Sequence, residues 1–101
     1  MRVERKNMVI GIFGKNMERA NRLFDELIGN MFVKDLKEVT KRPFRRAILT
    51  DGTTYKVLPT NDSCRGNKID KAYISGDLPV KFIYEVMPLL FTSGTNVEYF
   101  D

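Results

Sequence analysis

The chain has 101 residues, of which 43% are hydrophobic and 30% charged, as expected for one soluble globular domain spanning residues 1–101. One cysteine and no histidine exclude an internal disulfide, Cys/His metal sites and histidine-based acid–base catalysis. No apolar run approaches the roughly 18 residues of a membrane span. The charged N-terminal segment is a poor secretory signal, so we expect a cytoplasmic protein that has no membrane partner.

Net charge is +4 and is unevenly distributed along the sequence. Residues 1–50 carry 12 basic and 6 acidic side chains, whereas residues 51–101 carry 5 basic and 7 acidic ones. A basic N-terminal half favours a polyanionic partner. A net positive charge is common among small proteins, however, and does not identify a particular partner.

The first predicted elements are a strand in residues 7–13 and a helix that follows it. The run Met8–Phe13 is apolar without alternation, as in a strand buried on both faces. Asn16 is a good N-cap residue, and Gly29-Asn30 should end the helix in a positive-φ conformation. Between them one apolar stripe is formed by Ala20, Leu23, Phe24, Leu27 and Ile28.

The middle of the chain predicts a β-hairpin. Residues 31–40 fit either one or two further helical turns or a short strand, and Lys41-Arg42-Pro43 ends that segment. Residues 44–59 are predicted to form two strands joined at Asp51-Gly52, which is a type I′ turn signal.

The C-terminal third predicts a strand in residues 69–75, a helix and a last strand in residues 97–100. Asp77 should cap the helix, which begins near Pro79, and residues 93–96 should form a turn. The predicted apolar stripe of this helix consists of Val80, Ile83, Tyr84 and Met87. Alternating strands and helices favour an α/β fold, a small mixed sheet with a β-hairpin and two packed helices, over a β-rich α+β arrangement.

Residues 11–16 superficially match a phosphate-binding loop. That loop needs a glycine where this chain has Val9, and a hydroxyl residue after the lysine where it has Asn16. We therefore interpret Gly14-Lys15-Asn16 as a tight strand-to-helix turn, next to which Lys15 could bind an anion weakly.

A second motif begins at the hairpin. Its parts are Gly52-Thr53, the loop Ser63-Cys64-Arg65-Gly66, then Lys68 and Asp70, and the apolar strand Ala72-Tyr73-Ile74. In this order they resemble part of the ATPase domain of phage large terminase subunits, the viral DNA-packaging motors. The strand and helix of residues 8–28 are similar to the segment that lies upstream in that family.

Departures from the family pattern argue against catalysis. The family has Asp-Glu, for metal binding and water activation, where this chain has Gly76-Asp77. Without that acidic pair and a phosphate-binding loop, phosphoryl transfer lacks groups to position and stabilise its charge. The resemblance thus implies a phage or prophage accessory protein that is not an enzyme and needs no cofactor or metal.

A basic cluster around Pro43-Phe44 is the predicted nucleic-acid site. Its cations could neutralise phosphates, and Phe44 could stack on a base of a single strand. The predicted binding residues are Lys37, Lys41, Arg42, Phe44, Arg45, Arg46 and, from the later loop, Arg65. The alternative for the cluster is a solvated edge strand, and for Arg65 an ion pair with Asp62 or Asp70.

The functional prediction is a non-catalytic binding module that binds nucleic acid through this basic face. The alternative is a protein-interaction module, either a homodimer or an inhibitor of a host or viral protein. A degenerate nucleotide binder is a third hypothesis, and a phage-encoded protein would act in the host cytoplasm.

Overall fold

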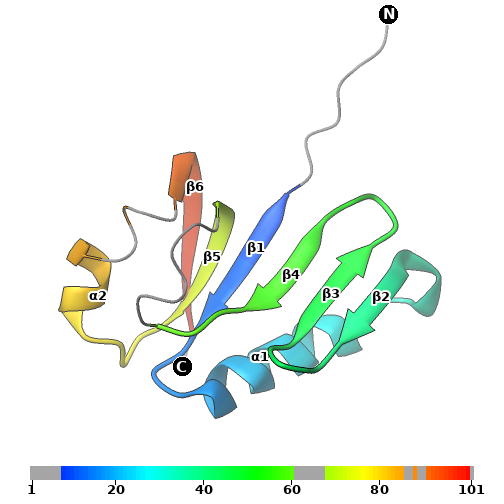
Figure 1. Cartoon of the computed structure of the whole chain (residues 1–101), viewed down its shortest axis with the longest axis horizontal. Coiled ribbons are helices and arrows are strands. Elements are labelled where there is room, and N and C mark those ends of the chain that lie inside the picture. The colour runs from blue at the N-terminus through cyan, green and yellow to red at the C-terminus, as the bar shows by residue number, and fades with distance from the viewer. Residues whose placement is uncertain (1–7, 61–67, 86–87, 89–90, 101) are drawn as a thin grey trace, which may run out of the picture.

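The computed structural model describes residues 8–60, 68–85, 88 and 91–100 (Figure 1). One mixed sheet with two α-helices confirms the predicted α/β fold class. The elements in chain order are β1 (Val9–Phe13), α1 (Met17–Gly29), the 3-10 helix η1 (Val33–Asp35), β2 (Leu36–Thr40), β3 (Arg46–Leu49), β4 (Thr54–Val57), β5 (Ile69–Ser75), α2 (Val80–Glu85) and β6 (Phe91–Phe100).

The strands form one mixed sheet in the order β2-β3-β4-β1-β5-β6 (Figure 1). Strand β1 pairs in parallel with both β4 and β5, and β5 pairs in parallel with β6. Strands β2, β3 and β4 are antiparallel. Because β1 lies inside the sheet and is covered on both faces, its sequence is apolar throughout.

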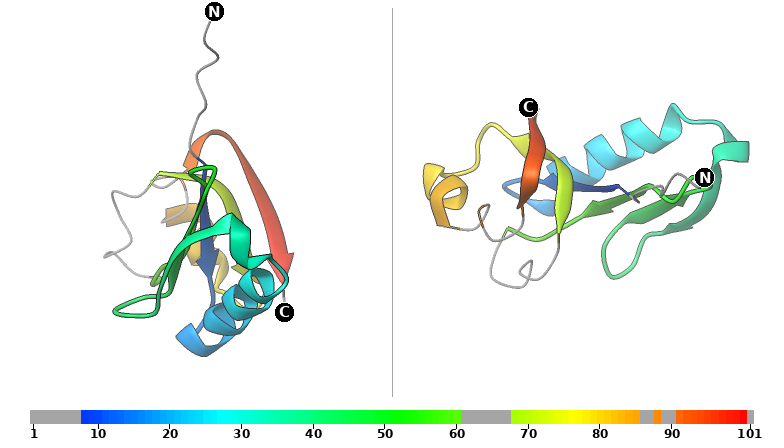
Figure 2. Two further views of the ribbon diagram at one scale, coloured as in Figure 1. Left: turned by 90° about the vertical axis from the view of Figure 1, so that its right-hand side faces the viewer. Right: turned by 90° about the horizontal axis from the view of Figure 1, so that it is seen from above.

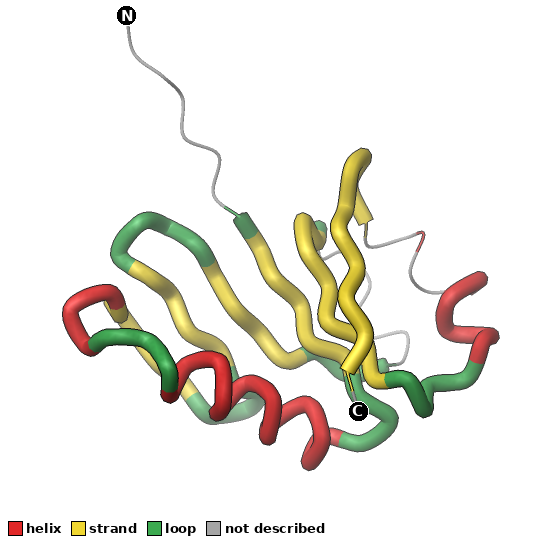
Figure 3. The backbone as a smooth tube through the Cα atoms, turned by 180° about the vertical axis from the view of Figure 1, so that it is seen from behind, coloured by secondary structure: helices red, strands yellow, loops and turns green. Residues whose placement is uncertain are grey.

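Helix α1 lies across one face of the sheet (Figure 2, Figure 3). As predicted, Asn16 caps it, its side-chain oxygen accepting a hydrogen bond of 3.0 Å from the backbone N–H of Arg19. The helix also ends at Gly29, but Asn30 has φ −90° and ψ 0°, so the positive φ expected there is wrong. Neither helix within the described ranges is long and apolar enough to span a membrane.

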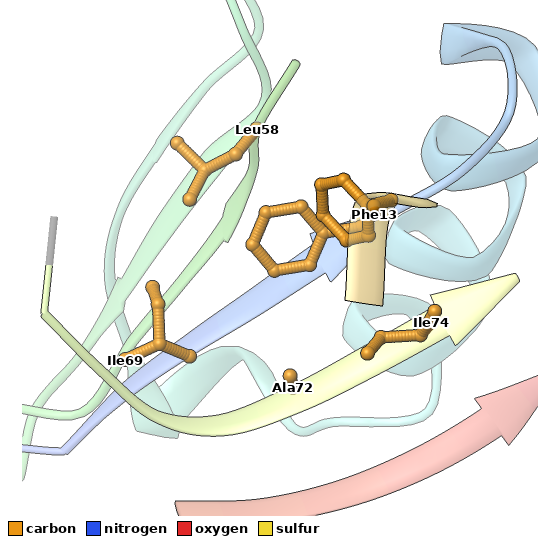
Figure 4. Packing of buried hydrophobic residues seen from close by; sticks show 6 residues of the cluster. Phe13, Leu58, Ile69, Ala72 and Ile74 are labelled. Carbon is orange, nitrogen blue, oxygen red and sulfur yellow. The ribbon is translucent and has the colours of Figure 1, made fainter. Parts of the chain in front are cut away.

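Side chains of β1 divide the core into two clusters, one on each face of the sheet. Ile12 and Phe13 are successive strand residues and point to opposite faces. The cluster beneath α1 contains Ile12, Ala20, Phe24, Ala47 and Val57. The opposite cluster contains Phe13, Leu58, Ile69, Ala72, Ile74 and Phe82 (Figure 4). Phe82 brings α2 onto this second face, its ring centroid lying 5.4 Å from that of Phe13.

The turn between β1 and α1 requires a glycine. A Cβ atom at Gly14 would lie 2.9 Å from the backbone oxygen of Asn16 and 3.0 Å from the backbone nitrogen of Ala20. Gly14→Ala should therefore lower the free energy of unfolding by about 1–3 kcal/mol. Gly29→Ala is the matched control, because its Cβ would meet nothing within 4 Å and should be neutral or stabilising by up to about 1 kcal/mol. Equal destabilisation of both variants in urea denaturation would contradict this close turn.

Strands β3 and β4 form the predicted hairpin, with a different turn. Among the described residues positive φ is confined to Gly52, at 95°, whereas a type I′ turn would require it at Asp51 as well. Leu49 closes the loop, accepting from the Gly52 N–H at 3.0 Å and donating its own N–H to the Thr53 oxygen at 2.8 Å. The hairpin therefore has a three-residue loop, which needs a single glycine.

For residues 31–40 the sequence predicted either further helical turns or a short strand, and the structure contains both. A single 3-10 turn, η1, comes first, and strand β2 follows it at the edge of the sheet. Thr50 fixes this segment to the hairpin, its N–H donating to the Asp35 oxygen at 3.0 Å.

Two predictions for the C-terminal third are wrong. In α2 the buried residue is Phe82, while Val80 and Tyr84 of the expected stripe are 65% and 76% exposed. Ile83 of that stripe does pack against the core and is partly buried. Met87 lies outside the described residues. The expected turn at residues 93–96 is part of β6, whose pairing with β5 is irregular between Ile69 and Lys71. That irregularity accommodates the extra residues of β6 without ending the strand.

Candidate nucleic-acid interface

Residues 41–45, which connect β2 to β3, border a concave surface that we call the basic hollow. Its volume is about 240 Å³. Four of the predicted binding residues, Arg42, Phe44, Arg45 and Arg46, line it together. The complete lining is Thr40, Arg42, Pro43, Phe44, Arg45, Arg46, Lys56, Val57 and Leu58.

Two predicted binding residues lie elsewhere, and a third is outside the described part of the chain. Lys37 in β2 and Lys41 after it are exposed but do not line the hollow. Arg65 falls outside the described residues. Asp70, a suggested partner of Arg65, accepts a hydrogen bond of 2.8 Å from the Val9 N–H, which ties β5 to the start of β1.

Acidic side chains compensate two of the cations. The Arg45 guanidinium contacts the Asp25 carboxylate of α1 through Nε–Oδ1 at 3.0 Å and Nη2–Oδ2 at 3.4 Å. Arg46 Nη2 lies 3.5 Å from Glu38 Oε2 on β2. Lys41 and Arg42 form no ion pair with any residue in the described ranges, so their charges are the most available to a partner.

Lys56 also lines the hollow, although it was not among the binding residues predicted from the sequence. It is partly buried on β4 directly opposite Arg46 of β3. Burial, followed by the charge of Arg46, lowers the pKa of Lys56 below its ordinary value. The predicted hairpin could have shown this pair, because alternation along both strands places residues 46 and 56 on one face.

Phe44 supplies an aromatic side chain at the same place. It is 40% exposed, so much of its ring is accessible. Val57 and Leu58 also border the hollow but are themselves buried, at 0% and 8% exposure. The hollow thus combines an accessible aromatic ring with several cations, as expected for a site that receives flat rings and anions.

A second polar cluster lies where β1 and β5 end, next to the start of α1. The Asp77 carboxylate accepts a hydrogen bond from the Ser75 hydroxyl, and its other oxygen lies 3.4 Å from Nε of Arg19. The Ser75 hydroxyl, followed by the charge of Arg19, lowers the pKa of Asp77 below its ordinary value. Asp77 is therefore paired with a cation of this chain, and the described residues contain no group of three potential metal ligands.

The Asp77 cluster predicts a pH effect on stability. A carboxyl group whose pKa is lower in the folded state stabilises the fold above its ordinary value of 3.8, and this stabilisation is lost as the pH falls below it. Asp77→Asn should lower the Tm at neutral pH and flatten the decline of Tm below pH 3.8. Thermal melts over the acid range test this, and parallel declines of variant and wild type would contradict it.

Comparisons with known proteins bear on the fold. No protein-family model matches the sequence, and neither does any curated protein. A phage large terminase has a similar fold. It comes from a thermophilic bacteriophage, and its structure matches this chain with a TM-score of 0.61 and 12% sequence identity.

The two chains differ greatly in length. The similarity covers 94% of this chain but 26% of the terminase chain. The terminase resemblance predicted from the sequence is therefore confirmed at the level of the fold, and it extends over most of this chain.

Proposed function

We propose that this chain is a non-catalytic binding module that holds nucleic acid on the basic face formed by β2, the 41–45 connection and the β3–β4 hairpin. The observation that carries the proposal is the basic hollow, where cations from separate strands surround an accessible aromatic ring. Its residues are brought together by antiparallel pairing, since Lys56 lies ten residues beyond Arg46 in sequence yet opposite it in the sheet.

Charge distribution supports the proposal. Lys41 and Arg42 are exposed next to the hollow, where phosphates could approach them without breaking an ion pair within the described ranges. Ion pairs with Asp25 and Glu38 orient the guanidinium groups of Arg45 and Arg46. The same ion pairs neutralise part of the positive charge of these two residues. Binding of this kind depends on displaced counterions and falls with salt.

The Asp77 cluster supports the non-catalytic part of the proposal. Arg19 lies on the carboxylate that would otherwise attract a cation, and residues 9 and 16 lack the glycine and hydroxyl of a phosphate-binding loop. The similarity of the fold to a phage terminase supports an origin in a phage or prophage.

Fluorescence anisotropy with labelled single-stranded and double-stranded DNA tests the proposal. We expect saturable binding at low salt that weakens as salt is raised. Absence of binding to either form of DNA and to RNA of the same length at low salt would refute it.

A protein-interaction module is the second candidate, favoured by exposed apolar side chains in η1 and β2. Phe32 and Val33 at η1 are 70% and 86% exposed, and Val39 on the edge strand β2 is 43% exposed. Exposed side chains of this kind occur at protein contacts. Light scattering of the same sample separates the candidates, because a homodimer has twice the chain mass of 11.7 kDa.

A further inference from the structure

The basic hollow brings an accessible aromatic ring and several cations together on one concave surface. We propose, building on the function proposed above, that it selects single-stranded nucleic acid by holding one unpaired base against Phe44 and the adjacent phosphate at Lys56 and Arg46. Nucleic-acid binding as proposed above requires contacts to phosphates alone. A base held against Phe44 would add a preference for unpaired strands.

The accessible ring of the hollow determines which form of nucleic acid can use it. Phe44 lies in an open depression of about 240 Å³ beside the cations of the 41–46 segment. A base within a duplex is stacked on both faces and must leave the helix to enter such a site. An unpaired base makes the same contacts at a smaller cost, so the hollow favours single strands.

The lining suits a base next to a phosphate. Phe44 is accessible for stacking, which is tolerant of sequence because every base has a π-face. Pro43 is an exposed apolar residue of the same lining. The cations line a concavity, whereas readers of the duplex major groove insert a protruding helix or two-stranded ribbon.

Lys56 and Arg46 form the anion-binding side of the hollow. They are directly opposed across β3 and β4, and the structure places one carboxylate, Glu38, in an ion pair with Arg46. Burial and the charge of Arg46 lower the pKa of Lys56, and a phosphate bound beside both cations would offset that effect.

Two variants separate the base contact from the phosphate contact, with a short labelled oligothymidylate and a duplex of equal length as probes. Phe44→Leu keeps the apolar volume and should weaken binding to the single strand by about 5- to 150-fold, with duplex binding unchanged. Tyr84→Leu, at an aromatic residue that is 76% exposed on α2, is the matched control and should leave both affinities unchanged.

Lys56→Met tests the phosphate contact. We expect weaker binding of the oligothymidylate, because the variant lacks the ammonium group that would neutralise a phosphate. Lys56→Arg should retain the binding. Unchanged binding by Lys56→Met would overturn the assignment of the phosphate to this residue.

The outcomes distinguish this inference from the proposed function. Equal affinity for the single strand and the duplex, with no effect of Phe44→Leu, would refute the single-strand preference and leave nucleic-acid binding in place. Binding to neither probe at low salt would refute the proposed function itself.

Discussion

Phe24→Ala is expected to lower the free energy of unfolding by about 3–5 kcal/mol. Phe24 is 1% exposed and lies in the cluster beneath α1, where it joins the helix to Ile12 of β1 and Val57 of β4. Truncation would remove the ring and leave a cavity between helix and sheet. Because a domain of this size has a total stability of about 5–15 kcal/mol, the variant should lose a large fraction of its stability.

Thermal denaturation followed by circular dichroism measures this effect. A change of 1 kcal/mol shifts the Tm of a domain this size by about 4–8 °C, so the expected loss is large. Phe32→Ala is the matched control, since Phe32 is 70% exposed and should change stability by less than about 0.5 kcal/mol. Similar Tm shifts for the two phenylalanine variants would contradict the packing of α1 on the sheet.

Lys41→Gln combined with Arg42→Gln should weaken nucleic-acid binding by about 25-fold at about 0.1 M salt, if each cation neutralises one phosphate of a single strand. These two residues are exposed and have no ion pair within the described ranges, so their loss should leave the fold intact. Fluorescence anisotropy gives the change in Kd.

The control removes the same number of charges elsewhere. Lys34 lies in η1, at the other end of β2 from the 41–45 connection, and Lys81 lies on α2. Lys34→Gln combined with Lys81→Gln should retain affinity close to wild type. Equal losses in both double variants would show that net charge, and not the basic face, governs binding.

Local sequence patterns were sufficient to predict β1 and α1. Strand β1 is covered on both faces and its sequence is an unbroken apolar run, while α1 has a long apolar stripe and a capping residue. The six residues of α2 make fewer than two turns, so tertiary contact decided which side was buried, and Phe82 packed inward. The turn signal at residues 93–96 was overridden by pairing of β6 with β5.

The candidate site was predictable in part for the same reason. The residues from Arg42 to Arg46 are contiguous in sequence and line the hollow together, whereas Lys41 lies outside it. Lys56 reaches the hollow through strand pairing, and Asp25 compensates Arg45 from a separate helix. Such contacts depend on tertiary structure, which composition and spacing do not specify.

The salt dependence of single-strand binding tests the central claim most directly. With two to four phosphates neutralised, log affinity against log salt concentration should have a slope of about −1.4 to −2.8 for the wild type. The Lys41→Gln and Arg42→Gln double variant should have a slope shallower by about 1.4. A wild-type slope near zero, or the same slope in both proteins, would contradict binding through this basic face.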